Sequence, residues 1–200
     1  LMETTSGGSS GIFPDPALAE LGSAVESAVE NRARHLTVED FQELFDGVTR
    51  EAVALATAKI GANSTTVWVA SEDRGTLTVV LSWPVPELLG FAQPIDEGLI
   101  SLVLASEQAL CENQVYAHEA HSKRVDERLG KVTHSMIAAP LYVGGGGRGV
   151  FSCVRWGDAP ESADGEGFSA SDLNRVKQLS SVVERLLNYR ILLDLLGARL

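Results

Sequence analysis

Apolar residues recur every three or four positions in three parts of the chain, the spacing that gathers side chains on one face of an α-helix. The first helix is expected from residue 16 to about residue 35, with an apolar face formed by Leu18, Leu21, Val25 and Ala28. The second is expected from Thr37, the N-cap of a capping box with Asp40, to Gly61, which ends it. The third begins at Ser169, which forms the same kind of box with Asp172.

Between the helical parts, residues 65–70 and 76–83 are rich in Val, Thr and Trp and flank a turn, the pattern of a β-hairpin. Alternation in the second strand predicts one shared face for Leu77, Val79, Leu81 and Trp83. The remaining expected elements are a short helix over 98–106, a brief strand over 110–115, and two strands over 135–143 and 149–156. This order predicts an α+β fold, a sheet with helices packed on it.

The last helix carries apolar residues at alternating spacings of three and four, a coiled-coil heptad pattern. This stripe consists of Leu179, Val182, Leu186, Tyr189, Leu193, Leu196 and Leu200. A second apolar flank includes Leu187 and Ile191, so one side of the helix should cover its own sheet and the other a partner. The sequence therefore predicts a homodimer, in which Leu18, Leu21 and Val25 of the first helix join the interface.

Length and charge limit the possible partners. The 200 residues suit one domain, and their net charge of −11 argues against binding nucleic acid or an anionic membrane surface. The expected organisation is a flexible tail over 1–15, an N-terminal helix over 16–36, a domain over 37–190, and the end of the C-terminal helix, a coiled-coil linker, over 191–200.

Two cysteines cannot form a disulfide framework, which favours a reducing, cytoplasmic location. No apolar run reaches the length of a membrane span, because Arg190 and Asp194 interrupt the apolar C-terminal stretch. We therefore expect a cytoplasmic protein with neither a membrane nor nucleic acid among its partners.

The polar segment from residue 111 to residue 134 contains residue types that bind metals, namely Cys111, His118, His121 and His134. Their spacing matches no standard zinc pattern, which favours a solvated polar segment whose histidines bind nothing in particular. No metal ligand is assigned, and whether this group binds a metal stays open.

Four stretches together resemble the GAF domains of signalling proteins. These are GLISLVLASEQALCENQ over 98–114, SMIAAPL over 135–141, RGVFSCVRW over 148–156 and FSASDLNRVKQLSSVVERLL over 168–187. The resemblance implies a central antiparallel β-sheet, profilin-like and related to PAS domains, with long terminal helices packed on it. It also implies helices that join protomers on one face of the sheet and a small-molecule pocket on the other.

By this resemblance the pocket would lie between the sheet and the segment that follows the short helix. The implied ligand-binding residues are Trp83, Leu99, Val103, Asn113, Tyr116, His118, Val125, His134 and Met136. Cyclic-nucleotide-binding members have an Asn-Lys pair and a Phe before an Asp-Glu, and here only Asp126-Glu127 is present. Bilin-binding members have a Cys-His pair, which neither Cys111 nor Cys153 forms. The ligand and any cofactor remain unknown.

The expected function is that of a regulatory, non-enzymatic sensory domain in a signalling or transcription-regulating protein. It would bind a small molecule and pass the signal through dimerising terminal helices to an effector domain or partner protein. One alternative is a ligand-free dimerisation scaffold. A second is a redox enzyme resembling the free methionine sulfoxide reductases of the same family, with Cys111 as the reactive thiol.

Overall fold

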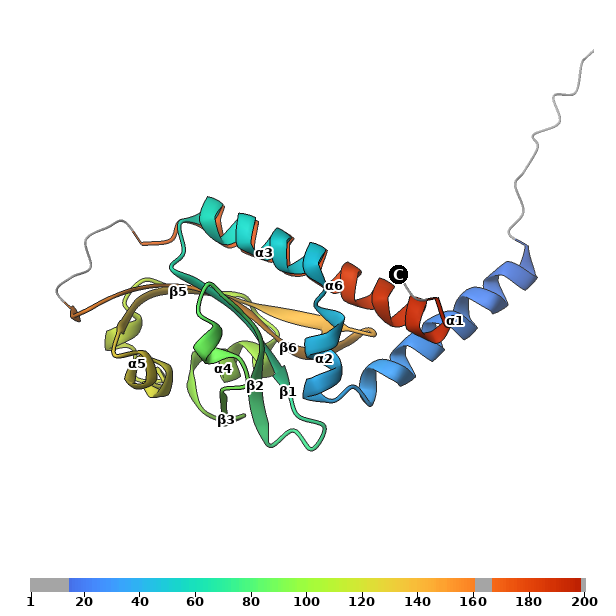
Figure 1. The fold of residues 1–200 in the computed structure, drawn as a ribbon, viewed down its shortest axis with the longest axis horizontal. Coiled ribbons are helices and arrows are strands. Elements are labelled where there is room, and N and C mark those ends of the chain that lie inside the picture. Colours follow the sequence, from blue (N-terminus) through green and yellow to red (C-terminus); the bar gives the residue numbers. More distant parts are fainter. Residues whose placement is uncertain (1–14, 161–166, 199–200) are drawn as a thin grey trace, which may run out of the picture.

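A computed structural model describes residues 15–160 and 167–198, so Leu200 and all but Asp15 of the tail expected over 1–15 lie outside these ranges. A six-stranded antiparallel sheet with strand order β3-β2-β1-β6-β5-β4 forms its centre (Figure 1). The strands are β1 (Ser64–Ala70), β2 (Thr76–Trp83), β3 (Ala92–Pro94), β4 (Leu110–Glu112), β5 (Val132–Val143) and β6 (Gly146–Gly157). The helices are α1 (Pro16–Arg34), α2 (Val38–Leu44), α3 (Gly47–Ile60), α4 (Gly98–Ser106), α5 (Arg124–Leu129) and α6 (Ala170–Leu195). The predicted α+β class is confirmed.

The sheet has a buried core on each face. On one face α3 and α6 cover the sheet, and on the other α4 and α5 do (Figure 1). The helix α6 faces the sheet with Val176, Ser180, Val183, Leu187 and Ile191, all of them buried. Because these spacings of three and four residues use one side of α6, residues of its other apolar stripe such as Val182 and Tyr189 stay exposed, whereas Leu179 packs at the edge of this core.

The prediction of one helix from Thr37 to Gly61 is wrong, because α2 ends before Phe45 and a separate helix, α3, begins at Gly47. Asp46 acts as a second N-cap, and its carboxylate accepts hydrogen bonds from the backbone and side chain of Thr49, both over 2.8 Å. Arg50 donates to the carbonyl of Phe45 over 2.8 Å. A side chain that caps the start of a new helix competes with continuation of the preceding helix. Here the cap formed by Asp46 ends α2 and starts α3.

The shared face predicted for strand β2 is also wrong, because a β-bulge interrupts the alternation. Val67 pairs with Leu81, but the next residue, Trp68, pairs with Val79, so Val80 is the extra residue. Leu77 and Val79 pack under α4, whereas Leu81 packs with the core under α3 and α6. By alternation Trp83 follows Leu81 to that second face, where its side chain is 47% exposed.

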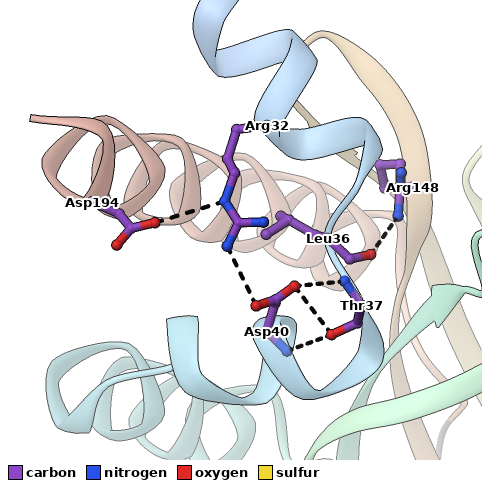
Figure 2. Close-up of polar contacts among 6 residues, drawn as sticks. All are labelled: Arg32, Leu36, Thr37, Asp40, Arg148 and Asp194. Atoms are coloured by element: carbon purple, nitrogen blue, oxygen red, sulfur yellow. Dashed lines mark hydrogen bonds and ion pairs between the residues drawn. The ribbon is translucent and has the colours of Figure 1, made fainter.

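A polar junction joins both terminal helices where α1 ends (Figure 2). The guanidinium of Arg32 lies 3.4 Å from Asp40 of α2 and 3.7 Å from Asp194 of α6. Arg148 of β6 donates to the carbonyl of Leu36 over 3.2 Å. The first part of α1 projects beyond this junction, past the end of α6 (Figure 1).

Among the described residues, no helix is both long and apolar enough to cross a membrane.

Candidate functional site: a cavity between the sheet and its cover

A cavity of about 40 Å³ lies between one face of the sheet and the elements that cover it, α4 and residues 121–126. Its floor consists of Ser64, Thr66, Trp68, Thr133, Met136, Ser152, Val154 and Trp156, all on β1, β5 and β6. Its roof consists of Gly98, Leu99, Ile100, His121, Ser122, Val125 and Asp126, and Leu88 and Gln93 complete the wall. A mostly apolar wall with a few polar groups is typical of small-molecule pockets.

Four hydroxyl side chains lie in the floor, three of them on β1 and β6 and the fourth, that of Thr133, on β5. Thr66 of β1 pairs directly with Ser152 of β6, and Ser64 lies two residues before Thr66 on the same face. The hydroxyl of Thr66 accepts a hydrogen bond from the indole nitrogen of Trp68 over 2.9 Å. Ser64 is 0% exposed, and its Oγ has no hydrogen-bond partner among the described residues. The centre of the sheet therefore presents polar groups to the cavity.

The roof is bonded to β5 through Asp126. Its carboxylate lies 3.0 Å from His121 Nε2 and accepts from the backbone N–H and hydroxyl of Thr133 over 3.0 and 2.5 Å. Burial acts to raise the pKa of Asp126, but the bonds from His121 and Thr133 outweigh it, so its pKa lies below the ordinary value. An ionised carboxylate can only accept, which places a proton on His121 Nε2.

A second set of contacts holds residues 121–126 of the roof against the start of α4. Glu97 precedes this helix without capping it, and its carboxylate accepts from Ser122 Oγ over 2.7 Å and Arg124 Nε over 2.9 Å. Gly98 has a φ of +87°, and a β-carbon there would lie 2.9 Å from Cβ of Ser122. Glycine at this position allows the segment to cross closely over the start of α4. The ion pair is partly exposed, so it can be opened at low cost.

The variant Asp126→Asn is expected to lower the free energy of unfolding at neutral pH by about 2 kcal/mol, because asparagine cannot accept every bond of the carboxylate. Since the pKa of Asp126 is lowered by folding, its contribution is complete above the unfolded value, about 3.9, and is lost as the pH falls through the folded value. Urea denaturation at several pH values measures this free energy. The difference in free energy of unfolding between Asp126→Asn and wild type should shrink below about pH 4.

Asp158→Asn is the matched control for this measurement. Asp158 forms an exposed ion pair with Lys131, so its replacement should leave stability nearly unchanged at every pH. A deficit of Asp126→Asn that persists undiminished at low pH would contradict the assigned role of the carboxylate.

The structure brings three of the nine expected ligand-binding residues to the cavity, namely Leu99, Val125 and Met136. Val103 is buried in the same core without lining the cavity. The amide of Asn113 is used elsewhere: it accepts from the N–H of Phe168 over 2.8 Å and donates to its carbonyl over 3.0 Å. Asn113 therefore fixes the chain just before α6.

The other expected residues lie outside the lining of the cavity. His118 Nδ1 accepts from the backbone N–H of Ala120 over 3.1 Å. His134 is the extra residue of a bulge in β5, and its buried ring packs against Tyr116 with centroids 5.8 Å apart. Neither ring nitrogen of His134 has a partner among the described residues. Trp83 lies after the bulge of β2, outside the lining.

The candidate metal ligands do not gather at one point. Cys111 packs with the core under α6, and its thiol lies 3.6 Å from the carbonyl of Phe168, whereas His121 lines the cavity on the opposite face. Within residues 15–160 and 167–198, no three His, Cys, Asp or Glu side chains could together hold a metal ion.

The residues expected at a dimer interface differ in how far the chain itself covers them. Leu21, Val182, Tyr189 and Leu196 are exposed, and Val25, Leu179, Leu186 and Leu193 are partly buried. Leu18 lies in α1. An open groove of about 440 Å³ separates the two helices and is lined partly by Val25, Val29, Tyr189 and Leu192. The chain itself thus leaves this apolar stripe largely uncovered.

Solved structures with the same arrangement exist, although no protein-family model and no curated protein sequence matches the chain. One is the GAF domain of a phosphoenolpyruvate-protein phosphotransferase from Coxiella burnetii, with a TM-score of 0.58 and 14% identity over 92% of this chain and 100% of that one. The chain has the GAF fold. The GAF-B domain of DevS from Mycobacterium smegmatis gives a TM-score of 0.53 and 17% identity, covering 71% of this chain and 91% of the other.

A GAF-fold enzyme is also similar. The free methionine-R-sulfoxide reductase from Neisseria meningitidis gives a TM-score of 0.56 and 17% identity, covering 88% of this chain and 93% of the other. The GAF fold of this chain is therefore compatible with both regulatory and enzymatic relatives. Whether this chain acts as a regulatory domain or as an enzyme depends on the residues of its own cavity.

Sequence reasoning missed the polar part of this GAF cavity. Ser64 precedes the strand expected over 65–70, Thr66 and Ser152 lie in expected strands with no role assigned, and His121 and Asp126 were not combined. One signal was available: β1 is buried along its whole length, yet hydroxyls occupy its first three positions, Ser64, Thr65 and Thr66. A fully apolar face would be expected there if it met only core.

Proposed function

We propose that this GAF domain is the sensory domain of a cytoplasmic signalling or transcription-regulating protein and binds a small molecule in its cavity. The observation that carries the proposal is a cavity with hydrogen-bonding groups in its floor, beneath a roof held by a few polar contacts. Such a roof can open to admit a ligand and close over it.

Binding would move the roof, because the cavity as it stands has room for only a few water molecules. The roof is bonded to Thr133 of β5, and the other end of this strand is bonded to α6. There Ser180 donates to the carbonyl of Pro140 over 3.0 Å, and Glu184 accepts from the N–H of Tyr142 over 2.9 Å. A ligand that binds one arrangement of the roof more tightly than the other would favour that arrangement, and with it the corresponding position of α6.

Dimerisation through α1 and α6 completes the proposal. The uncovered stripe with Val182 and Tyr189 on α6 continues toward Val25 of α1 across the groove. Two copies that pair these faces would bury apolar side chains that a monomer leaves in water. An effector domain or partner protein would receive the signal from the terminal helices, which meet at the Arg32 junction (Figure 2).

Native mass spectrometry of protein purified without denaturation tests the binding proposal. Wild type is expected to carry a small molecule, and Val125→Trp, which fills the cavity, is expected to lose it. Leu102→Trp is the matched control, because Leu102 lies on the exposed side of α4. Equal extra mass on wild type and Val125→Trp would place the ligand elsewhere, and no extra mass on either would favour the ligand-free scaffold.

The reductase alternative predicts a reactive thiol at the cavity, and the positions of both cysteines oppose it. Cys153 lies between the cavity-lining Ser152 and Val154, so its side chain points to the other face. Burial raises the pKa of this thiol to about 11, despite a hydrogen bond with Thr65. Burial also raises the pKa of Cys111. Neither thiol is activated as a nucleophile would be.

We therefore expect no turnover of free methionine sulfoxide with a thiol reductant. In a labelling experiment with an aromatic disulfide at neutral pH, Cys111 should react slowly and Cys153 only after unfolding, since Cys153 is the more deeply buried. Protein in urea, in which both thiols react, is the control. Turnover that disappears in Cys111→Ser would instead support the enzyme.

A further inference from the structure

We propose that the cavity takes an uncharged small molecule whose hydrogen-bonding group, such as an amide, meets the hydroxyl of Ser64. This rests on the proposed sensory function and narrows it to one chemical class of ligand. Charge, hydrogen bonding and size in the cavity each support it.

The charge of the lining excludes ions. Among the described residues that line the cavity, the ionisable side chains are His121 and Asp126, which are bonded to each other. An anionic ligand would lose its water without gaining a cation, because Arg124 is bonded to Glu97 at the outer side of the roof. A cationic ligand would have to displace His121 from Asp126. An uncharged ligand has neither cost.

The floor of the cavity supplies the hydrogen bond. Two hydroxyls on neighbouring positions of β1 differ in their partners: Thr65, facing α3, lies 2.7 Å from the hydroxyl of Thr57. Ser64, facing the cavity, is as deeply buried and has no partner among the described residues. A buried hydroxyl without a partner destabilises the folded state, and alanine would fit the same place without that cost. The hydroxyl of Ser64 is therefore explained by a ligand that it binds.

Size limits the class further. A cavity of about 40 Å³ accepts only a few heavy atoms before the roof must move. Propionamide, propionate and propylammonium have similar shapes and differ in charge, so they serve as probes. Their binding can be followed by NMR through the methyl groups of Leu99, Val125 and Met136, which line the cavity.

Propionamide is expected to shift these methyl signals with a dissociation constant at least about tenfold lower than that of either charged probe, a difference set by desolvation of the charge. Ser64→Ala should weaken propionamide binding severalfold and raise the melting temperature of the free protein by about 1–3 °C. Thr65→Val is the matched control: removing a paired hydroxyl on the other face should lower the melting temperature.

Three results would overturn the inference. Tighter binding of propionate or propylammonium at the same methyl groups would contradict the ligand class and leave the proposed sensory site standing. A Ser64→Ala protein that melts below wild type and binds propionamide unchanged would show that the hydroxyl is structural. Absence of any methyl response to all three probes contradicts the class as well; if native mass spectrometry also shows no bound molecule, the proposed function fails separately.

Discussion

The variant Val182→Asp is expected to raise the dissociation constant of the proposed dimer at least about 100-fold, equivalent to nearly 3 kcal/mol. In a single chain the side chain of Val182 is 45% exposed, so the carboxylate stays hydrated and the domain stays folded. In a dimer that pairs the α6 stripes, the same carboxylate would be buried without a partner. Sedimentation velocity over a series of protein concentrations measures the change.

Asn174→Asp is the matched control for Val182→Asp. It introduces the same charge at an exposed position of α6 outside the heptad stripe, so the dimer should be unaffected. Tyr189→Asp, at a position 53% exposed on the stripe, should weaken the dimer like Val182→Asp. Wild-type protein that sediments as a monomer at tens of micromolar, an ordinary scale for weak association, would contradict dimerisation.

The variant Gly149→Ala is expected to destabilise the fold by about 3 kcal/mol or more. Gly149 lies in the central strand β6, paired with Val69 on one side and Leu141 on the other. A β-carbon there would lie 1.9 Å from the carbonyl oxygen of Trp68, a backbone atom held within the sheet. Relief would require β1 and β6 to separate at the strand that forms the cavity floor.

Thermal denaturation should show this as a fall in melting temperature of about 6 °C or more, given the usual relation for a chain of this size. Gly146→Ala is the control, because a β-carbon at Gly146, in the same strand, meets no atom within 4 Å. Equal melting temperatures for the two variants would mean that β1 and β6 do not approach as closely as described.

Helix capping and periodicity carried most of the fold prediction. The capping boxes of Thr37 and Ser169 form as expected, and α4 runs from Gly98 to Ser106 as the sequence indicated. These signals are local, because a cap or an apolar stripe acts over a few residues. The sequence also separated two apolar sides of α6, because the residues that face the sheet, such as Leu187 and Ile191, form a set distinct from the heptad stripe.

The parts that could not be read from the sequence depend on long-range pairing. The bulges at Val80 and His134 change which face each later residue occupies, and only the register with the neighbouring strand reveals them. Trp83 was consequently expected at the cavity. The bond between His121 and Asp126 depends on how the segment folds over the sheet, which residue types do not determine.

A crystal structure of the protein purified without denaturation tests the proposed site most directly. It should contain electron density for a small uncharged molecule between Ser64 and Met136 of the floor and Val125 of the roof, with residues 121–126 closed over it. Density at the groove between α1 and α6 instead, or a floor and roof packed together with no molecule between them, would contradict the proposed sensory site.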